Sequence, residues 1–221
     1  MDTPTYKEHY EEKVLPGFSE FRYLTRGENP IATMQDFKYK PDSRPLFNSF
    51  ARRLRVAKSM QSVNFDDFSE GTANGYAALN KHFLMFSALE RYTADCEGVK
   101  GGEYHRSLRY IPESDFKTIK EAFDLVDTNG AIFDLLSANG SISQKVCLRE
   151  FKSGESYRKG IYISSMLRNL YAHGVLSAFP RGAKEGSIEL LANFMTDFIY
   201  NSIRKDFWFR LNEVKIELDT K

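Results

Sequence analysis

The chain has 221 residues, of which 42% are hydrophobic, 14% are aromatic and 28% are charged, and its formal net charge is +1. This length and composition predict one well-packed core and exclude a disordered chain, which would carry fewer hydrophobic and aromatic residues. A net charge near zero excludes a general electrostatic attraction to nucleic acid, so any RNA binding would depend on local basic patches.

Cysteine usage and the N-terminal residues bear on the cellular compartment. Cys96 and Cys147 show neither metal-ligand spacing nor a disulfide framework, which is typical of a reducing environment. Residues 1–13 are polar and acidic, so we do not expect a signal peptide. No apolar run is long enough to span a bilayer. We therefore expect a cytoplasmic protein with no membrane partner.

Residues 1–70 are expected to form an N-terminal extension that packs on the main body. Residues 6–15 are predicted to form a short helix that ends at Pro16 and Gly17. Four apolar residues that follow are expected to dock on the main body: Phe18, Phe21, Tyr23 and Leu24. A second helix is predicted over residues 45–60, because Pro45 suits a first helical turn.

The helix predicted over residues 45–60 is the most basic segment of the chain, with Arg52, Arg53, Arg55 and Lys58. It could be a stripe that follows the phosphates of a nucleic acid. It could equally be a solvated face that pairs with Asp66, Asp67 and Glu70, which is the commoner role of a charge run. The sequence leaves both interpretations open.

The main body, residues 71–221, is predicted to be all-α and to form one compact unit with the extension. Apolar residues recur at helical spacing in six segments, which are 76–94, 115–126, 131–138, 141–151, 160–173 and 187–209. Residues 61–75 are expected to be a loop. Residues 214–218 are expected to form a tail or a short strand.

Individual positions in these segments carry further expectations. Ser114 is a good N-cap residue for the helix over 115–126. In the segment 141–151 the residues expected to face inward are Ile142, Val146 and Leu148. Trp208 lies between two phenylalanines and is expected to be packed. His82 is expected to be structural, because no second ligand lies at metal-binding spacing. His105, in a glycine-bearing loop, has no predicted role.

The helix predicted over 160–173 carries an unusual group of polar residues. Ile163, Met166, Leu167 and Leu170 form its buried stripe. Arg168 is followed directly by Asn169, and four residues separate Arg168 from His173. Gly174 is a typical helix end. On an ideal helix Asn169 and His173 share a face, whereas Arg168 and His173 point apart.

This pattern resembles the motif of the HEPN superfamily, the higher eukaryotes and prokaryotes nucleotide-binding domains. In that motif a polar residue, often asparagine, follows the arginine directly, and four to six residues separate the arginine from a histidine. The resemblance covers roughly residues 77–221. It implies a HEPN-like helical bundle that forms a homodimer, with Arg168, Asn169 and His173 as catalytic residues. Active members are metal-independent ribonucleases, so the resemblance implies no cofactor and no metal.

One position departs from some toxin members of the family. These carry a tyrosine two residues after the histidine, which a partner enzyme modifies with nucleotides. The present chain has Val175 at that position, so silencing by that route is not expected.

The three motif residues suit RNA cleavage without a metal. A 2′-hydroxyl that attacks the neighbouring phosphate needs a proton acceptor and a positive group near the phosphate oxygens. His173 fits the first role and Arg168 the second, while Asn169 could position either group. The expected products are a 2′,3′-cyclic phosphate and a 5′-hydroxyl. The expected partners are RNA, a second copy of the chain and a possible antitoxin or regulatory protein, as for a toxin or defence effector.

Two other interpretations of the motif stay open. His173 could simply cap a helix, with Arg168 and Asn169 solvated. Alternatively, the chain could be a non-catalytic nucleotide- or RNA-binding module of the same fold that acts as an interaction subunit, because fold alone does not establish function. Glu90, on the helix over 76–94, could face the motif or form a salt bridge with a neighbouring arginine.

Overall fold

A computed structural model describes residues 12–61, 63–100 and 102–220 of the chain. Over these ranges the chain is all-α and contains no strand, which confirms the predicted fold class. The helices are α2 (Phe18–Leu24), α3 (Arg44–Ser59), α4 (Glu70–Glu90), the π-helical turn η1 (Arg91–Glu97), the 3₁₀ turn η2 (Tyr104–Arg106), α5 (Glu113–Val126), α6 (Ala131–Asn139), α7 (Ile142–Ser153), the 3₁₀ turn η3 (Tyr157–Gly160), α8 (Ile161–Ala172) and α9 (Ser187–Asp219).

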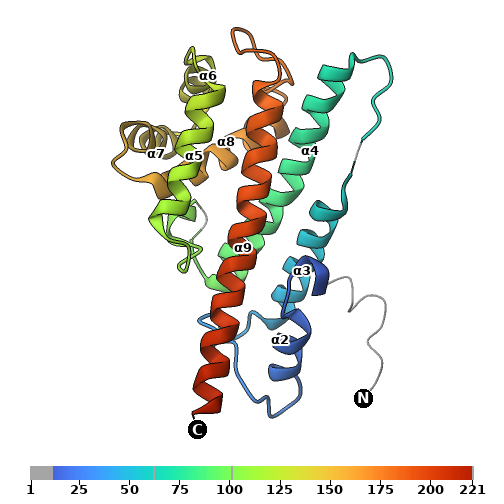
Figure 1. The fold of residues 1–221 in the computed structure, drawn as a ribbon, viewed down its shortest axis with the longest axis vertical. Helices are drawn as coiled ribbons and strands as arrows, with labels where there is room; N and C mark the ends of the chain where they lie inside the picture. The colour runs from blue at the N-terminus through green and yellow to red at the C-terminus, as the bar shows by residue number, and fades with distance from the viewer. Residues whose placement is uncertain (1–11, 62, 101, 221) are drawn as a thin grey trace.

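Helix α9 runs along the whole molecule and organises the other helices around it (Figure 1). Helices α3 and α4 lie on one side of α9 and α5 to α7 lie on the other, while α8 crosses behind α9 in this view. Helix α4 packs against α3, α8 and α9. The apolar stripe of α9 is buried along almost its full length, from Ile188 to Val214, because helices pack on it from both sides.

The end of α9 differs from the prediction. The helix was expected to stop at residue 209 and to leave an extended segment over 214–218, but it continues to Asp219. Phe207, Leu211 and Val214 are buried at helical spacing, and this buried stripe keeps the segment helical. Trp208 was expected to be packed, but it is 45% exposed.

The start of α4 also differs from the prediction, because residues 70–75 are helical rather than part of a loop. Ser69 caps the helix by accepting a hydrogen bond from the Thr72 backbone N–H, which is a common N-terminal signal. Gly75 lies inside the helix, where a Cβ atom would come within 2.7 Å of the Ala178 Cβ. The glycine therefore allows the segment after α8 to pack directly on α4.

Three smaller predictions about individual residues are wrong. Ile142 is 85% exposed and Val146 is 40% exposed, and α7 buries Cys147, Leu148 and Phe151 instead. Tyr23 is 68% exposed, although its neighbours Phe18, Phe21 and Leu24 are buried as expected. Helix α5 begins at Glu113 after Pro112, so Ser114 is not its cap. In each case tertiary packing decides which face of the helix is buried or at which residue the helix begins, and sequence periodicity alone does not determine either.

The N-terminal region packs on the helical bundle through aromatic rings. The Phe21 ring centre lies 4.5 Å from that of Phe47 in α3 and 5.5 Å from that of Phe207 in α9. Phe21 also meets Phe37 edge to face at 5.0 Å. Most of the helix predicted over residues 6–15 lies outside the described residues, and the division of the chain at residue 70 stays a prediction.

A fully buried arginine joins the N-terminal region to the bundle. The Arg210 Nε donates to Asp206 Oδ2 at 2.7 Å, and its Nη1 donates to the carbonyl oxygens of Phe37 and Lys38 at 3.1 Å. Its Nη2 donates to the Glu97 carboxylate. Burial raises the pKa of Glu97, and the nearby Asp206 carboxylate raises it further. Both carboxylates therefore share one guanidinium, while the Leu108 N–H also donates to Glu97 and the Tyr110 N–H also donates to Asp206.

His82 is buried between three helices, as its expected structural role requires. Its Nε2 lies 3.1 Å from the Ser164 carbonyl oxygen, and its Nδ1 lies 3.4 Å from the Thr196 hydroxyl. Because a carbonyl oxygen only accepts hydrogen bonds, the proton is assigned to Nε2. Burial lowers the pKa of His82 to about 4, so the ring stays neutral in the folded protein well below neutral pH.

His82 is expected to make folding stability sensitive to mild acid. The unfolded chain takes up this proton below a pKa of about 6.5, whereas the folded chain takes it up only near pH 4. Stability therefore falls as pH drops through this window, by about 2 kcal/mol between pH 7 and pH 5. Urea unfolding at both pH values measures this, with His82→Gln as the reference. An equal loss of stability in the variant would contradict the assignment.

Within the described ranges, no helix combines the length and apolar character needed to cross a bilayer.

Candidate functional site

Helix α8 presents the predicted motif. It follows the 3₁₀ turn η3 and spans Ile161–Ala172. The predicted apolar stripe is confirmed, because Ile163, Met166, Leu167 and Leu170 are buried. His173 is the C-cap residue, and Gly174 follows with a positive φ of 70°. This left-handed conformation ends the helix, as the glycine predicted.

Arg168 is held in one orientation by two neighbours. Its Nη1 donates to Asn169 Oδ1 at 2.7 Å, and its Nη2 donates to Glu90 Oε2 at 2.6 Å. The Arg168 guanidinium carbon also lies 5.8 Å from the ring centres of Phe83 and Phe86, within range for a cation–π contact. About 30% of the side chain is exposed, and each terminal nitrogen keeps a further N–H. Arg168 is therefore oriented but still open to a ligand.

Glu90 is the residue that links the motif to the rest of the bundle. It is the last residue of α4, directly before the π-helical turn η1, and such turns often occur at functional sites. Its Oε1 accepts a hydrogen bond of 3.1 Å from the Tyr104 hydroxyl, and burial and the Glu90 carboxylate raise the pKa of Tyr104 to about 12. The sequence had left open whether Glu90 faces the motif or forms a salt bridge. The salt bridge is present, and its partner is Arg168 itself.

Among the described residues, no hydrogen bond joins His173 to Arg168 within one chain. The two residues are five positions apart, which places them about 140° apart on an ideal helix. Over the described ranges, no hydrogen bond involves the His173 ring, and the side chain is exposed. Its backbone N–H donates to the Asn169 carbonyl oxygen at 3.0 Å. The structure thus brings Arg168, Asn169 and Glu90 together and leaves the imidazole open to solvent at the helix end.

Comparison of this chain with protein-family models, with curated proteins and with solved structures found no match. The geometry of the site and the motif of α8 are therefore the basis for assigning a function.

His105, which has no predicted role, also lies against the motif helix. The Nδ1 of His105, in η2, lies 2.8 Å from the Tyr162 hydroxyl of α8. Burial lowers the pKa of His105, and Lys159, Arg106 and Arg158 lower it further. The loop that carries His105 has no periodicity, so only tertiary packing shows that it lies against α8.

Two cations of the basic helix α3, Arg53 and Lys58, contact neutral groups. Arg53 donates from Nη1 to the Ser87 hydroxyl at 2.6 Å, and the Lys58 Nζ lies 4.3 Å from the Tyr200 ring centre. Among the described residues, no ion pair joins Arg52, Arg53 or Lys58 to a carboxylate. Arg52, Arg53 and Lys58 therefore lack the carboxylate partners that the solvated-face interpretation predicted.

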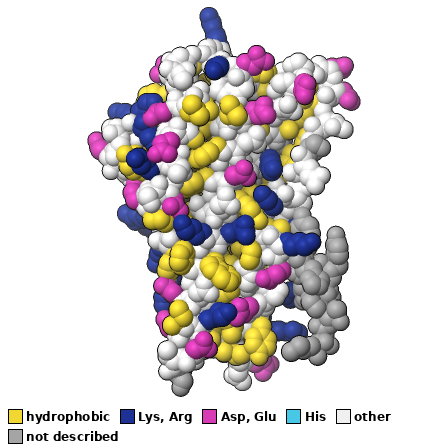
Figure 2. Space-filling view, in the orientation of Figure 1, with side chains coloured by type: hydrophobic (Ala, Val, Ile, Leu, Met, Phe, Trp, Pro, Cys, Tyr) yellow, Lys and Arg dark blue, Asp and Glu magenta, His cyan; other side chains and the backbone are white. Residues whose placement is uncertain are grey.

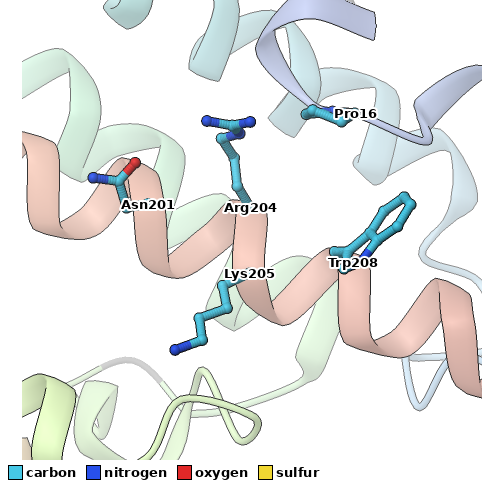
Figure 3. A pocket seen from close by; sticks show the side chains of 5 residues that line it. All are labelled: Pro16, Asn201, Arg204, Lys205 and Trp208. Carbon is cyan, nitrogen blue, oxygen red and sulfur yellow. The ribbon is translucent and has the colours of Figure 1, made fainter.

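Another basic surface lies along α9. Figure 2 shows lysine and arginine side chains interleaved with hydrophobic ones across the middle of this face. A pocket of about 380 Å³ on α9 is lined by Pro16, Asn201, Arg204, Lys205 and Trp208 (Figure 3). Figure 3 shows that Arg204 and Lys205 point to opposite sides of the helix, and Lys205 forms an ion pair of 2.7 Å with Asp115. The two cations of this pocket therefore do not converge on a single position where one phosphate could bind.

Over the described ranges, no cluster of three or more histidine, cysteine or carboxylate residues has a geometry suited to holding a metal ion.

Proposed function

We propose that this protein is a metal-independent endoribonuclease with a HEPN-like helical bundle. The observation that supports this most is the oriented Arg168 guanidinium, which Glu90 and Asn169 hold on the helix that ends in the exposed His173. An arginine fixed by its neighbours can bind a phosphate with little further ordering, because its planar fork matches the phosphate oxygens. An exposed imidazole can reach a substrate proton and act as a general acid or base.

The proposed reaction transfers a phosphodiester within the RNA strand. The 2′-oxygen forms a bond to phosphorus, and the bond from phosphorus to the 5′-oxygen of the next nucleotide breaks. The imidazole of His173 accepts the 2′-hydroxyl proton or protonates the leaving oxygen, and Arg168 stabilises the charge that builds on the phosphate. The products are a 2′,3′-cyclic phosphate and a 5′-hydroxyl.

A homodimer would complete this site. Arg168 and His173 of one chain point apart, so the imidazole that serves one Arg168 would come from the second copy. Apolar side chains near the end of α8 are exposed, with Phe68 at 52%, Val175 at 48% and Phe179 at 38%. Exposed apolar groups of this kind are suited to a two-fold interface.

The test is cleavage of mixed single-stranded RNA in the presence of a chelator. We expect cleavage by the purified protein, products with 2′,3′-cyclic phosphate ends, and loss of about 100-fold or more in rate for Arg168→Ala. Sedimentation equilibrium of the same preparation is expected to show a dimer. Ends carrying a 3′-hydroxyl, or equal cleavage by Arg168→Ala, would contradict the proposal.

A non-catalytic RNA-binding module is the second candidate. The Arg168–Glu90 ion pair favours this candidate. The Glu90 carboxylate already accepts a hydrogen bond from the guanidinium, which would otherwise be available to the phosphate in the transition state. Such a module would bind RNA and leave it intact, and His173→Ala would change its affinity little.

A further inference from the structure

The exposed strip of α4 lies between two helices that each direct an arginine toward it. Phe83, Ser87 and Glu90 follow one another at i, i+4 and i+7, so they share one face of α4, and all three are partly exposed. On one side, Arg53 of α3 donates to Ser87 at 2.6 Å. On the other side, Arg168 of α8 donates to Glu90 at 2.6 Å. Ser87 and Glu90 are one helical turn apart, so the two guanidinium groups flank the same short length of α4.

The α3 side of this strip is hollowed. A pocket of about 230 Å³ lies between α3 and α4, and its lining residues are Ser49, Arg52, Arg53, Val56, Leu84 and Ser87. Two of these residues are arginines and none is acidic. Among the described residues no ion pair involves Arg52 or Arg53, and the partner of Arg53 is a neutral hydroxyl. The pocket is therefore positively charged.

The charges along the whole strip favour an anionic strand. Glu90 is the acidic residue on this part of α4, and Arg168 compensates it. Phe83 adds an aromatic ring beneath the Arg168 guanidinium, with 5.8 Å between the guanidinium carbon and the ring centre. Surfaces that bind single-stranded nucleic acid usually combine cations along the phosphate backbone with aromatic rings on which the bases stack.

We propose that α3, α4 and α8 form a groove for single-stranded RNA, defined by Arg52, Arg53, Phe83, Ser87 and Arg168. Arg168 binds the phosphate at the proposed cleavage position, Phe83 stacks on a neighbouring base, and Arg52 and Arg53 bind phosphates further along the strand. This inference rests on the proposed function for the role of Arg168. Binding of an RNA strand at the Arg52–Arg53 pocket does not depend on catalysis.

The probe for this groove is a fluorescent single-stranded oligonucleotide with a 2′-O-methyl group on every ribose. The 2′-oxygen of this probe cannot attack, so binding is measured without cleavage. We expect the double variant Arg52→Ser, Arg53→Ser to bind about 10-fold more weakly at low salt. Its plot of log affinity against log salt is expected to be shallower by about 1 to 1.5, because each phosphate contact to a single strand contributes about 0.7 to the slope. Phe83→Ala is expected to weaken binding about 10-fold, with an unchanged slope.

Arg204→Ser is the matched control, since it removes a cation from the separate pocket on α9 (Figure 3). It is expected to bind like the unmodified protein. Circular dichroism of each variant checks folding, which we expect to be intact because Arg52 and Arg53 are exposed. Equal affinity and equal slope for the double variant and the control would overturn the groove, as would a lack of probe binding by the unmodified protein.

The outcomes separate the groove from the nuclease. Weaker binding by the double variant, together with intact unmodified RNA in the presence of wild-type protein, would support the groove and reject the nuclease. Loss of cleavage in Arg168→Ala, together with normal binding and cleavage by the double variant, would support the nuclease and reject the groove.

Discussion

Replacing Arg210 by methionine is expected to lower the free energy of unfolding by about 3 to 5 kcal/mol. The arginine side chain is fully buried, and so are the Glu97 and Asp206 carboxylates that it pairs with. Methionine fills similar space but leaves both carboxylates without their cation. The same change removes the hydrogen bonds to the Phe37 and Lys38 carbonyl oxygens, which connect the N-terminal region to α9. Urea unfolding followed by circular dichroism measures the loss.

Arg204→Met is the matched control for Arg210→Met, because it makes the same change on the same helix at a partly exposed position. It is expected to shift stability by about 1 kcal/mol or less. Adding Glu97→Gln to Arg210→Met should recover part of the loss, since it removes one of the two buried acidic groups that lose their partner. An Arg210→Met variant as stable as the control would show that the network contributes little.

Replacing His173 by alanine is expected to slow RNA cleavage by about 100-fold to 10,000-fold, the usual contribution of a general acid or base. The change should leave folding intact, because the side chain is exposed and its backbone hydrogen bond to Asn169 does not require the ring. Cleavage rates under saturating RNA, with thermal unfolding of the same samples, measure both effects.

His105→Ala is the control for His173→Ala, because it removes a partly exposed histidine that contacts α8 through Tyr162. His105 bonds to Tyr162, so we expect a modest loss of stability and a cleavage rate within a few-fold of wild type. A large loss of cleavage in His105→Ala with normal cleavage in His173→Ala would move the acid–base role to η2. In that case the chemistry would take place within one chain rather than across a dimer.

Local signals in the sequence predicted the motif helix well. The apolar stripe of α8 and its end at Gly174 follow from helical periodicity and from the preference of glycine for positive φ. The contact between Glu90 and Arg168 could not be predicted in the same way, since they are 78 positions apart in the chain. The family resemblance suggested Glu90 as a candidate but offered no means of choosing its partner.

Errors in the fold prediction arose where local and tertiary preferences differ. The segment over 214–218 has a weak helical pattern by itself, but Val214 is buried beside Leu211, and this burial continues α9. Exposure of Trp208 arose in the same way, because the phase of a long helix decides which of three adjacent aromatic residues faces the core.

The sequence by itself determined that the chain is all-α, where the motif helix ends, and which residues lie on it, because these properties depend on neighbours within a few positions. The tertiary structure alone decided that Arg168 is oriented by Glu90, that Arg53 lies beside the same strip of α4, and that Arg210 holds Glu97 and Asp206 in the core. Each of these depends on long-range packing, which brings charged side chains from distant segments together where water can no longer solvate them fully.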